Sequence, residues 1–292
     1  MELTVTIDIF SGRPNPTITL KDNEARDLLE RLQPGPRLTR TEQRGLPPST
    51  LGYRGIVIEQ RDTPALGLPK VFRTLGSGLY GPRLAHRAAD EGFEDFLCGS
   101  AGPLGKFGLG AKFPPFLIDE IRRVRDLLER SPWKKPIFPV RLRCQCAPLY
   151  EPAWWNDGGQ RQFNNNCYNY ATNYRSDTFA QPGQAAGAMY TALTCASVRP
   201  AAIKDDLIDS PGAKNKCPKE GHLAALVIAP GSDFHWYRKG RNGYWTHKPG
   251  GTAATNLDNS GKLITDPRTA DRGPYTDFCT FMVVMHGHVK IS

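Results

Sequence analysis

Hydrophobic residues in the first part of the chain follow a strand period and then a helix period. Apolar residues occupy every second position from Leu3 to Ile9, which predicts a strand, and residues 17–20 predict a second one. Between them, Ser-Gly-Arg-Pro-Asn-Pro at 11–16 has the composition of a loop. A helix through Leu28, Leu29 and Leu32, strands over 55–59 and 70–73, and an amphipathic helix over 116–128 complete the predicted pattern.

The second part of the chain predicts an antiparallel meander. Residues 221–229 form an apolar run headed by a histidine, and residues 234–238 and 244–248 read as the next two strands. Asn242-Gly243 between the last two is a strong hairpin signal. A final strand is predicted within 278–289, and the alanine-rich stretch 185–196 predicts a helix that Gly187 weakens.

These patterns predict an α+β protein of two domains. Residues 1–135 form an N-terminal α+β domain without a chemical constellation, so its role is unknown. Residues 145–292 form the second domain, which contains all of the candidate chemistry. The Pro-rich stretch from Ser131 to Pro148 reads as the linker that joins them.

A formal charge of +9 and a pI near 9.2 suit an anionic partner such as an acidic polymer. Basic residues collect at Arg37–Arg44, Lys134–Arg143 and Arg238–Lys248, which predicts a solvated basic surface. No zinc-finger spacing or RNA-binding aromatic signature is present, so no specific nucleic-acid partner is expected.

Targeting signals and cysteine usage give a further set of expectations. The chain has no apolar run near the roughly 20 residues of a membrane span, and its N-terminus has no visible signal peptide. A soluble protein is expected, either cytoplasmic or exported by a route other than Sec. Seven cysteines leave at least one unpaired, and Cys144 and Cys146 are expected to be structural thiols, each with its own partner or none.

The stretch around Cys167 has the strongest chemical pattern. Three asparagines precede this cysteine, and Asn165 or Asn166 is expected to cap a helix that begins beside it. A thiol in the first turn of a helix has a lowered pKa and can act as a thiolate nucleophile. The alternative is a free cysteine that packs as a small hydrophobic side chain.

Two histidines could complete a catalytic site. His222 heads the predicted strand 221–229, and His235 lies on the neighbouring strand, so the two are expected to be close. In this hypothesis Cys167 is the nucleophile, His222 the general base and His235 the group that orients the base. The roles of the two histidines could also be reversed.

The order of a Cys-bearing helix, a His at the head of a strand and a polar residue on the next strand resembles the NlpC-type and CHAP branches of the papain-like cysteine hydrolases. The resemblance covers about residues 150–250 and implies a papain-like second domain, a Cys-bearing helix packed on the meander. It also implies hydrolysis of amide or peptide bonds in a protein or peptidoglycan-like substrate, without a cofactor. Residues assigned to an oxyanion hole or cleft are Gln160, Gln162, Asn166 and Trp155.

The sequence departs from the motifs of this family at two places. NlpC-type enzymes usually carry Asp-Cys-Ser-Gly, where this chain has Asn166-Cys167-Tyr168-Asn169. Papain-type enzymes place a Gln six positions before the Cys, where this chain has Arg161 between Gln160 and Gln162.

Two other functions compete with the hydrolase. The first is a catalytically inactive binding module that recognises carbohydrate or peptide through an aromatic face, made of Trp154, Trp155, Trp236, Tyr237 and Trp245. The second is a metal site from Asp233, His222, His235, His286 and His288, which ranks last because no metal-binding spacing supports it.

Overall fold

The computed structural model describes residues 1–38, 49–62, 64, 67–82, 84–88, 90, 92–98, 102–129 and 144–292. They belong to two compact units. The first contains Met1–Ile9, Asn15–Pro47 and Tyr53–Trp133, and the second contains Phe10–Pro14, Pro48–Gly52 and Lys134–Ser292. The predicted division was 1–135 and 145–292, so two short N-terminal pieces join the second unit. Most of the predicted linker and the basic stretch Lys134–Arg143 lie outside the described residues.

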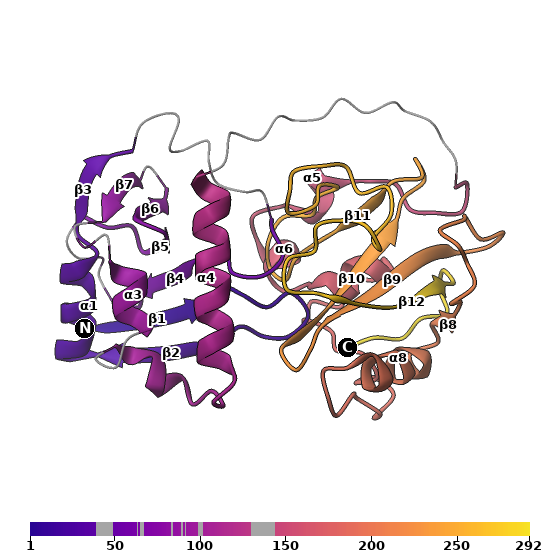
Figure 1. The fold of residues 1–292 in the computed structure, drawn as a ribbon, viewed down its shortest axis with the longest axis horizontal. Helices are drawn as coiled ribbons and strands as arrows, with labels where there is room; N and C mark the ends of the chain where they lie inside the picture. The colour runs from indigo at the N-terminus through magenta and orange to yellow at the C-terminus, as the bar shows by residue number, and fades with distance from the viewer. Residues whose placement is uncertain are drawn as a thin grey trace. The chain divides into compact units, whose positions relative to one another are not determined.

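The first unit is built on an antiparallel sheet of seven strands in the order β2-β1-β4-β5-β6-β7-β3 (Figure 1). Its side chains alternate as the sequence predicts: in β1 every second residue is buried, from Leu3 to Ile7. The elements of this unit are β1 (Glu2–Ile7), β2 (Thr17–Lys21), α1 (Asp22–Arg31), β3 (Pro34–Arg37), β4 (Ile56–Gln60), β5 (Val71–Leu75), β6 (Gly78–Gly81), β7 (Leu84–Ala88), α3 (Phe93–Cys98), the 3-10 helix η1 (Pro103–Phe107) and α4 (Phe113–Glu129).

The second unit is built on a five-stranded antiparallel sheet in the order β11-β10-β9-β12-β8. The predicted meander is therefore confirmed, with β9 and β10 as its long central pair. The elements of this unit are α5 (Pro152–Trp155), α6 (Gln160–Phe163), α7 (Cys167–Thr172), α8 (Cys195–Lys204), β8 (Ile208–Asp209), β9 (His222–Ala229), β10 (Asp233–Lys239), β11 (Trp245–His247) and β12 (Asp277–Val284).

A separate hydrophobic core lies on each face of this second sheet. On one face, Ala224, Leu226 and Trp236 pack with side chains of α7 and α8. On the other face, the neighbouring residues of the same strands pack with Tyr237 and Trp245. Because both faces are covered, β9 is buried along its whole length, as its uninterrupted apolar sequence indicates. The α+β class, with a Cys-bearing helix on an antiparallel meander, is confirmed.

The predicted helix over the alanine-rich stretch 185–196 is wrong. Turns and bends occupy most of this stretch, and α8 begins only at Cys195. Gly183 and Gly187 adopt positive φ values of 79° and 65°, a conformation that a regular helix does not contain. The backbone N–H of Gly183 also donates to the carboxylate of Asp205 at 2.6 Å, which fixes the turn.

The N-terminal loop from Phe10 to Pro14 is held in the second unit by the buried carboxylate of Asp233. This carboxylate accepts hydrogen bonds from the backbone N–H groups of Ser11, Gly12 and Arg13, and from the hydroxyl of Tyr275 at 2.6 Å. A Cβ on Gly12 would lie 2.5 Å from the carbonyl oxygen of Phe234, so glycine is required for this close approach.

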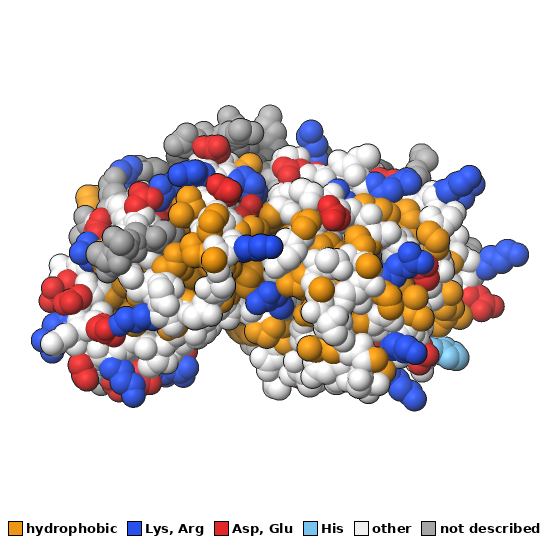
Figure 2. Space-filling model, turned by 60° about the horizontal axis from the view of Figure 1, so that its bottom comes forward, with side chains coloured by type: hydrophobic (Ala, Val, Ile, Leu, Met, Phe, Trp, Pro, Cys, Tyr) orange, Lys and Arg blue, Asp and Glu red, His pale blue; other side chains and the backbone are white. Residues whose placement is uncertain are grey.

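The basic stretch Arg238–Lys248 is not the solvated surface that its composition predicts. Arg238, Lys239 and Lys248 are all buried, and carbonyl oxygens accept their hydrogen bonds. Burial lowers the pKa of Arg238 from its usual value. On the face drawn in Figure 2, the other Lys and Arg side chains are dispersed among acidic and uncharged ones. Among the described residues, no helix is long and apolar enough to cross a membrane.

Candidate functional site

Asn166 caps the helix that begins at Cys167, as predicted. Its side-chain oxygen accepts hydrogen bonds from the backbone N–H groups of Tyr168 at 2.9 Å and Asn169 at 3.2 Å. In return, the side chain of Asn169 accepts the backbone N–H of Asn166 at 3.1 Å, which completes a capping box. Asn166 therefore has a structural role, and its buried side chain is not available as an oxyanion-hole donor.

The Cys167 thiol is sealed in the core of the second unit. The residue has no exposed surface and packs with Ala180, Ala224 and Trp236. Burial raises the pKa of this thiol well above its usual value, and the nearby charge of Asp233 raises it further. The position of Cys167 in the first turn of the helix does not offset these effects, so the prediction of a thiolate with a lowered pKa is wrong. The alternative, a cysteine packed as a small hydrophobic side chain, is what the structure shows.

His222 lies on the same face of the sheet as Cys167, but its imidazole forms its hydrogen bond with a different residue. Its Nε2 lies 2.7 Å from the carbonyl oxygen of Ala171, one helical turn after the cysteine. Because a carbonyl only accepts, Nε2 carries the proton. Burial lowers the pKa of this imidazole to about 3, so it is neutral under ordinary conditions. Its Nδ1 is buried and has no hydrogen-bond partner among the residues that the structure describes.

His235 points to the opposite face of the sheet from Cys167 and His222. It pairs directly with Val227 across the β9–β10 ladder, and Val227 belongs to the second core. Its Nε2 lies 2.9 Å from Nδ1 of His247, which is also buried. The structure therefore does not bring His235 together with Cys167 and His222, because a β-sheet separates them.

The other residues assigned to an oxyanion hole or cleft have structural or surface positions. Gln160 is exposed at the start of α6. The side-chain oxygen of Gln162 accepts the backbone N–H of Gly158 at 3.2 Å. Trp155 is buried edge-on against Tyr170, with ring centroids 5.2 Å apart. None of these contacts directs a donor toward the Cys167 sulfur.

Most of the predicted aromatic face is also buried. Trp236, Tyr237 and Trp245 have no exposed surface, so they belong to the two cores of the sheet. Trp154 is different, because 44% of its surface is exposed. The guanidinium of Arg161 lies 4.1 Å from the centroid of its indole ring, a cation–π contact at the protein surface.

Sequence reasoning missed the structural roles of two buried charged residues near this region. Asp233 was considered only as a metal ligand, whereas its carboxylate binds the backbone of the loop at 11–13. Lys248 donates to the carbonyl oxygens of Gln162, Asn165 and Gly250, and so holds the chain just before the Cys167 helix. In the part of the chain that the structure describes, no three His, Cys, Asp or Glu side chains are grouped to hold a metal ion.

Comparison with known proteins gives one informative relative. No model of a known protein family matches the chain, and no solved structure matches it. Insoluble matrix shell protein 1 from Ruditapes philippinarum is 49% identical to it over 142 residues. The match covers 91% of that protein and 48% of the present chain.

The chain belongs to the family of this shell matrix protein.

Membership of this shell matrix family contradicts the prediction that the chain is a thiol hydrolase. The relative is named as an insoluble matrix protein and not as a cysteine peptidase or amidase. The geometry agrees, because Cys167 is sealed and the two histidines bind other partners on opposite faces of the sheet. The relationship to the papain-like fold stays a prediction.

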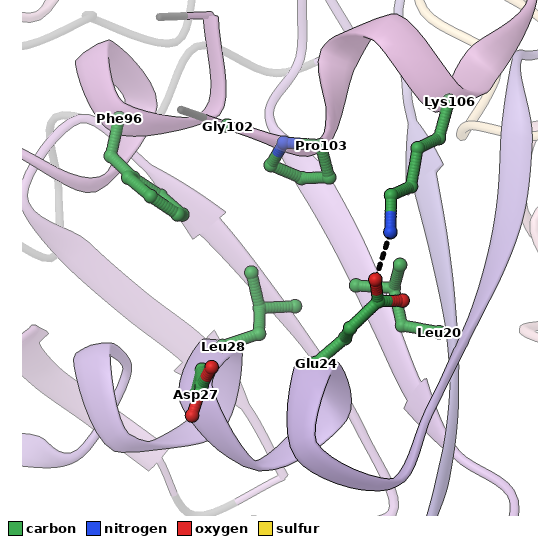
Figure 3. Close-up of a pocket in the computed structure, with 8 residues that line it drawn as sticks. All are labelled: Leu20, Glu24, Asp27, Leu28, Phe96, Gly102, Pro103 and Lys106. Carbon is green, nitrogen blue, oxygen red and sulfur yellow. Dashed lines mark hydrogen bonds and ion pairs between the residues drawn. The ribbon is translucent and has the colours of Figure 1, made fainter. Parts of the chain in front are cut away.

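The first unit has a pocket of about 150 Å³ between α1, β2, α3 and η1 (Figure 3). Leu20, Leu28 and Phe96 provide apolar lining, and Glu24 pairs with Lys106 across the pocket. The pocket shares no residue with the sequence-predicted site. Its lining residues offer no nucleophile or metal-binding cluster.

Proposed function

We propose that the chain is a non-catalytic structural protein of an insoluble extracellular matrix. The observation that carries this proposal is its 49% identity to an insoluble shell matrix protein over nearly the whole of that relative. The site geometry supports the same conclusion, because the best candidate nucleophile, Cys167, is a core residue with a raised thiol pKa.

Two disulfide bonds in the second unit support an extracellular location. Cys144 is bonded to Cys217 and Cys195 to Cys279, with sequence separations of 73 and 84 residues. Disulfides persist mainly in oxidising compartments. Each loop of this length stabilises the folded chain by about 4 kcal/mol in the chain-entropy model. A protein that must last in a matrix gains durability from such links.

We further propose that an acidic polysaccharide is the matrix component that the second unit contacts. Trp154 presents an exposed indole ring of the kind that packs on the apolar face of a sugar. Arg161, stacked on that ring, places a guanidinium where it can pair with a carboxylate or sulfate group. The chain's formal charge of +9 attracts such a polymer at longer range.

Fractionation tests the matrix function. After extraction of the organism's extracellular matrix with salt and non-reducing detergent, antibodies should detect the chain in the insoluble residue. Recovery of the chain from the cytosol alone would contradict the proposal.

Binding to beads of a carboxylated polysaccharide, with neutral cellulose as the reference, tests the polymer contact. Trp154→Ala should weaken binding by about tenfold, which corresponds to roughly 1.4 kcal/mol. Arg161→Gln should weaken it more than Arg175→Gln, which removes one equal charge from a residue paired with Asp177. Equal effects of the two Arg variants would show attraction by net charge alone and would refute the assigned contact.

A further inference from the structure

Three cysteines of the second unit are gathered at one place on its surface. Cys144 and Cys146 lie on the same tight turn, which the hydrogen bond from Ala147 N–H to the Cys144 carbonyl closes at 3.1 Å. Cys144 is buried and bonded to Cys217, which is exposed. Cys146 is an exposed free thiol. The turn therefore carries the buried end of a disulfide whose other end is exposed, together with a free thiol.

The turn directs Cys146 toward the segment that contains the far end of the disulfide. The Cys146 Sγ lies 3.4 Å from the carbonyl oxygen of Lys219, two residues after Cys217. Contacts on both sides hold the turn in this place. The Cys144 N–H donates to the carbonyl of Arg241 at 3.0 Å, and the Nε2 of His286 lies 2.9 Å from the carbonyl of Cys146.

We propose that this cluster is a thiol–disulfide exchange site, in which the bond to Cys217 moves between Cys144 and Cys146. The Cys146 thiolate attacks the Sγ of Cys217, and a new Cys146–Cys217 bond forms. The Cys144–Cys217 bond breaks, and Cys144 leaves as a thiolate that takes up one proton, equal to the one that Cys146 lost. One disulfide and one thiol are present before and after, so the reaction needs no oxidant or reductant.

The two pairings differ in what the chain offers to its surroundings. In the Cys144–Cys217 pairing, the free thiol is Cys146 and is exposed. In the Cys146–Cys217 pairing, the free thiol is Cys144, which occupies a buried position where a neutral thiol packs as a small hydrophobic group. The exchange thus determines whether the free thiol of this cluster is exposed, at Cys146, or buried, at Cys144. This inference stands on the cysteine cluster alone and does not require the proposed matrix function.

Trapping of the free thiol at each position tests the exchange. Purified full-length protein with intact disulfides is incubated at pH 6, 7 and 8 without added thiol. It is then unfolded in acid with N-ethylmaleimide, which stops exchange and labels free thiols. Both cysteines lie on one proteolytic peptide, and fragment ions that break at Gln145 between them show which one carries the label.

We expect the label to begin on Cys146 and to appear on Cys144 during incubation. The rate should rise with pH over this range, because the thiolate is the attacking species. Cys146→Ser should abolish labelling of Cys144, while Cys195–Cys279 stays paired in every sample and serves as the internal control. Absence of label on Cys144 at every pH would overturn the proposal, and so would equal labelling of Cys144 in the Cys146→Ser variant.

Discussion

Asn166→Ala should destabilise the second unit far more than the loss of an ordinary helix cap. The substitution removes the acceptor for the backbone N–H groups of Tyr168 and Asn169. Asn166 is fully buried, so water cannot replace the lost acceptor. Each buried N–H without a partner costs about 1–3 kcal/mol. For the two N–H groups together, the free energy of unfolding should therefore fall by roughly 2–6 kcal/mol, against about 1 kcal/mol for a typical cap.

The two carbonyl groups that Asn166 also contacts do not add to this cost. Its side-chain amide donates to the carbonyls of Gly12 and Ala180, at 2.7 and 2.8 Å. Gln181 donates to the same two carbonyls, at 2.8 and 3.2 Å, and to that of Phe179 at 2.9 Å, so each carbonyl keeps a share of the two Gln181 amide hydrogens in the variant. The predicted destabilisation therefore comes from the two helix N–H groups.

Urea unfolding with intact disulfides, followed by tryptophan fluorescence, measures this change, because four of the five tryptophans lie in the second unit. Asn166→Ser keeps an acceptor at the cap and should recover part of the loss. Asn164→Ala is the matched control, since Asn164 is exposed, and its effect should stay within about 0.5 kcal/mol. Equal stabilities for Asn166→Ala and Asn164→Ala would refute the capping account.

Two further predictions follow from the buried groups of the second unit. Burial lowers the pKa of His222 to about 3 in the folded protein, below its ordinary value of 6.5, so its contribution to stability is complete above pH 6.5 and is lost as the pH falls toward 3. In denaturant melts, the free energy of unfolding at pH 4.5 should be about 2–3 kcal/mol lower than above pH 6.5, and this difference should be smaller in His222→Gln. The same pH dependence in the variant and the wild type would contradict this prediction. Gly12→Ala should lower the free energy of unfolding by about 2–3 kcal/mol, because its Cβ would clash with Phe234. Gly212 has open space around it, so Gly212→Ala should be about as stable as the wild type. Equal stabilities of the two variants would exclude the clash.

The strands and the cap were predictable because both depend on local sequence. Alternation from Leu3 to Ile9 and the apolar run after His222 marked strands that the structure contains. The placement of His222 and His235 on opposite faces of the sheet could also have been predicted from the sequence. His235 alternates with Phe234 and Trp236, so once β9 and β10 pair across a short turn, its side chain must lie on the face away from α7.

The burial of the charged groups was not predictable, because their partners are distant along the chain. Asp233 binds backbone groups more than 200 positions away, at Ser11, and Lys248 binds the carbonyl of Asn165 across 83 positions. Composition near residue 240 indicated a basic surface, but tertiary contacts placed those cations inside. The thiol of Cys167 had the local sequence of a helix-start nucleophile, and only the packing of α7 on the sheet shows that it is sealed.

Cys167 is a sealed core residue of the second unit and not an accessible catalytic thiol. Alkylation of the native protein with a maleimide at neutral pH, followed by peptide mapping, tests it most directly. We predict that Cys146 reacts readily, while Cys167 reacts only through unfolding, at least 1,000-fold more slowly by the order of magnitude of protein stability. Rapid and stoichiometric modification of Cys167 in the folded protein would contradict the account.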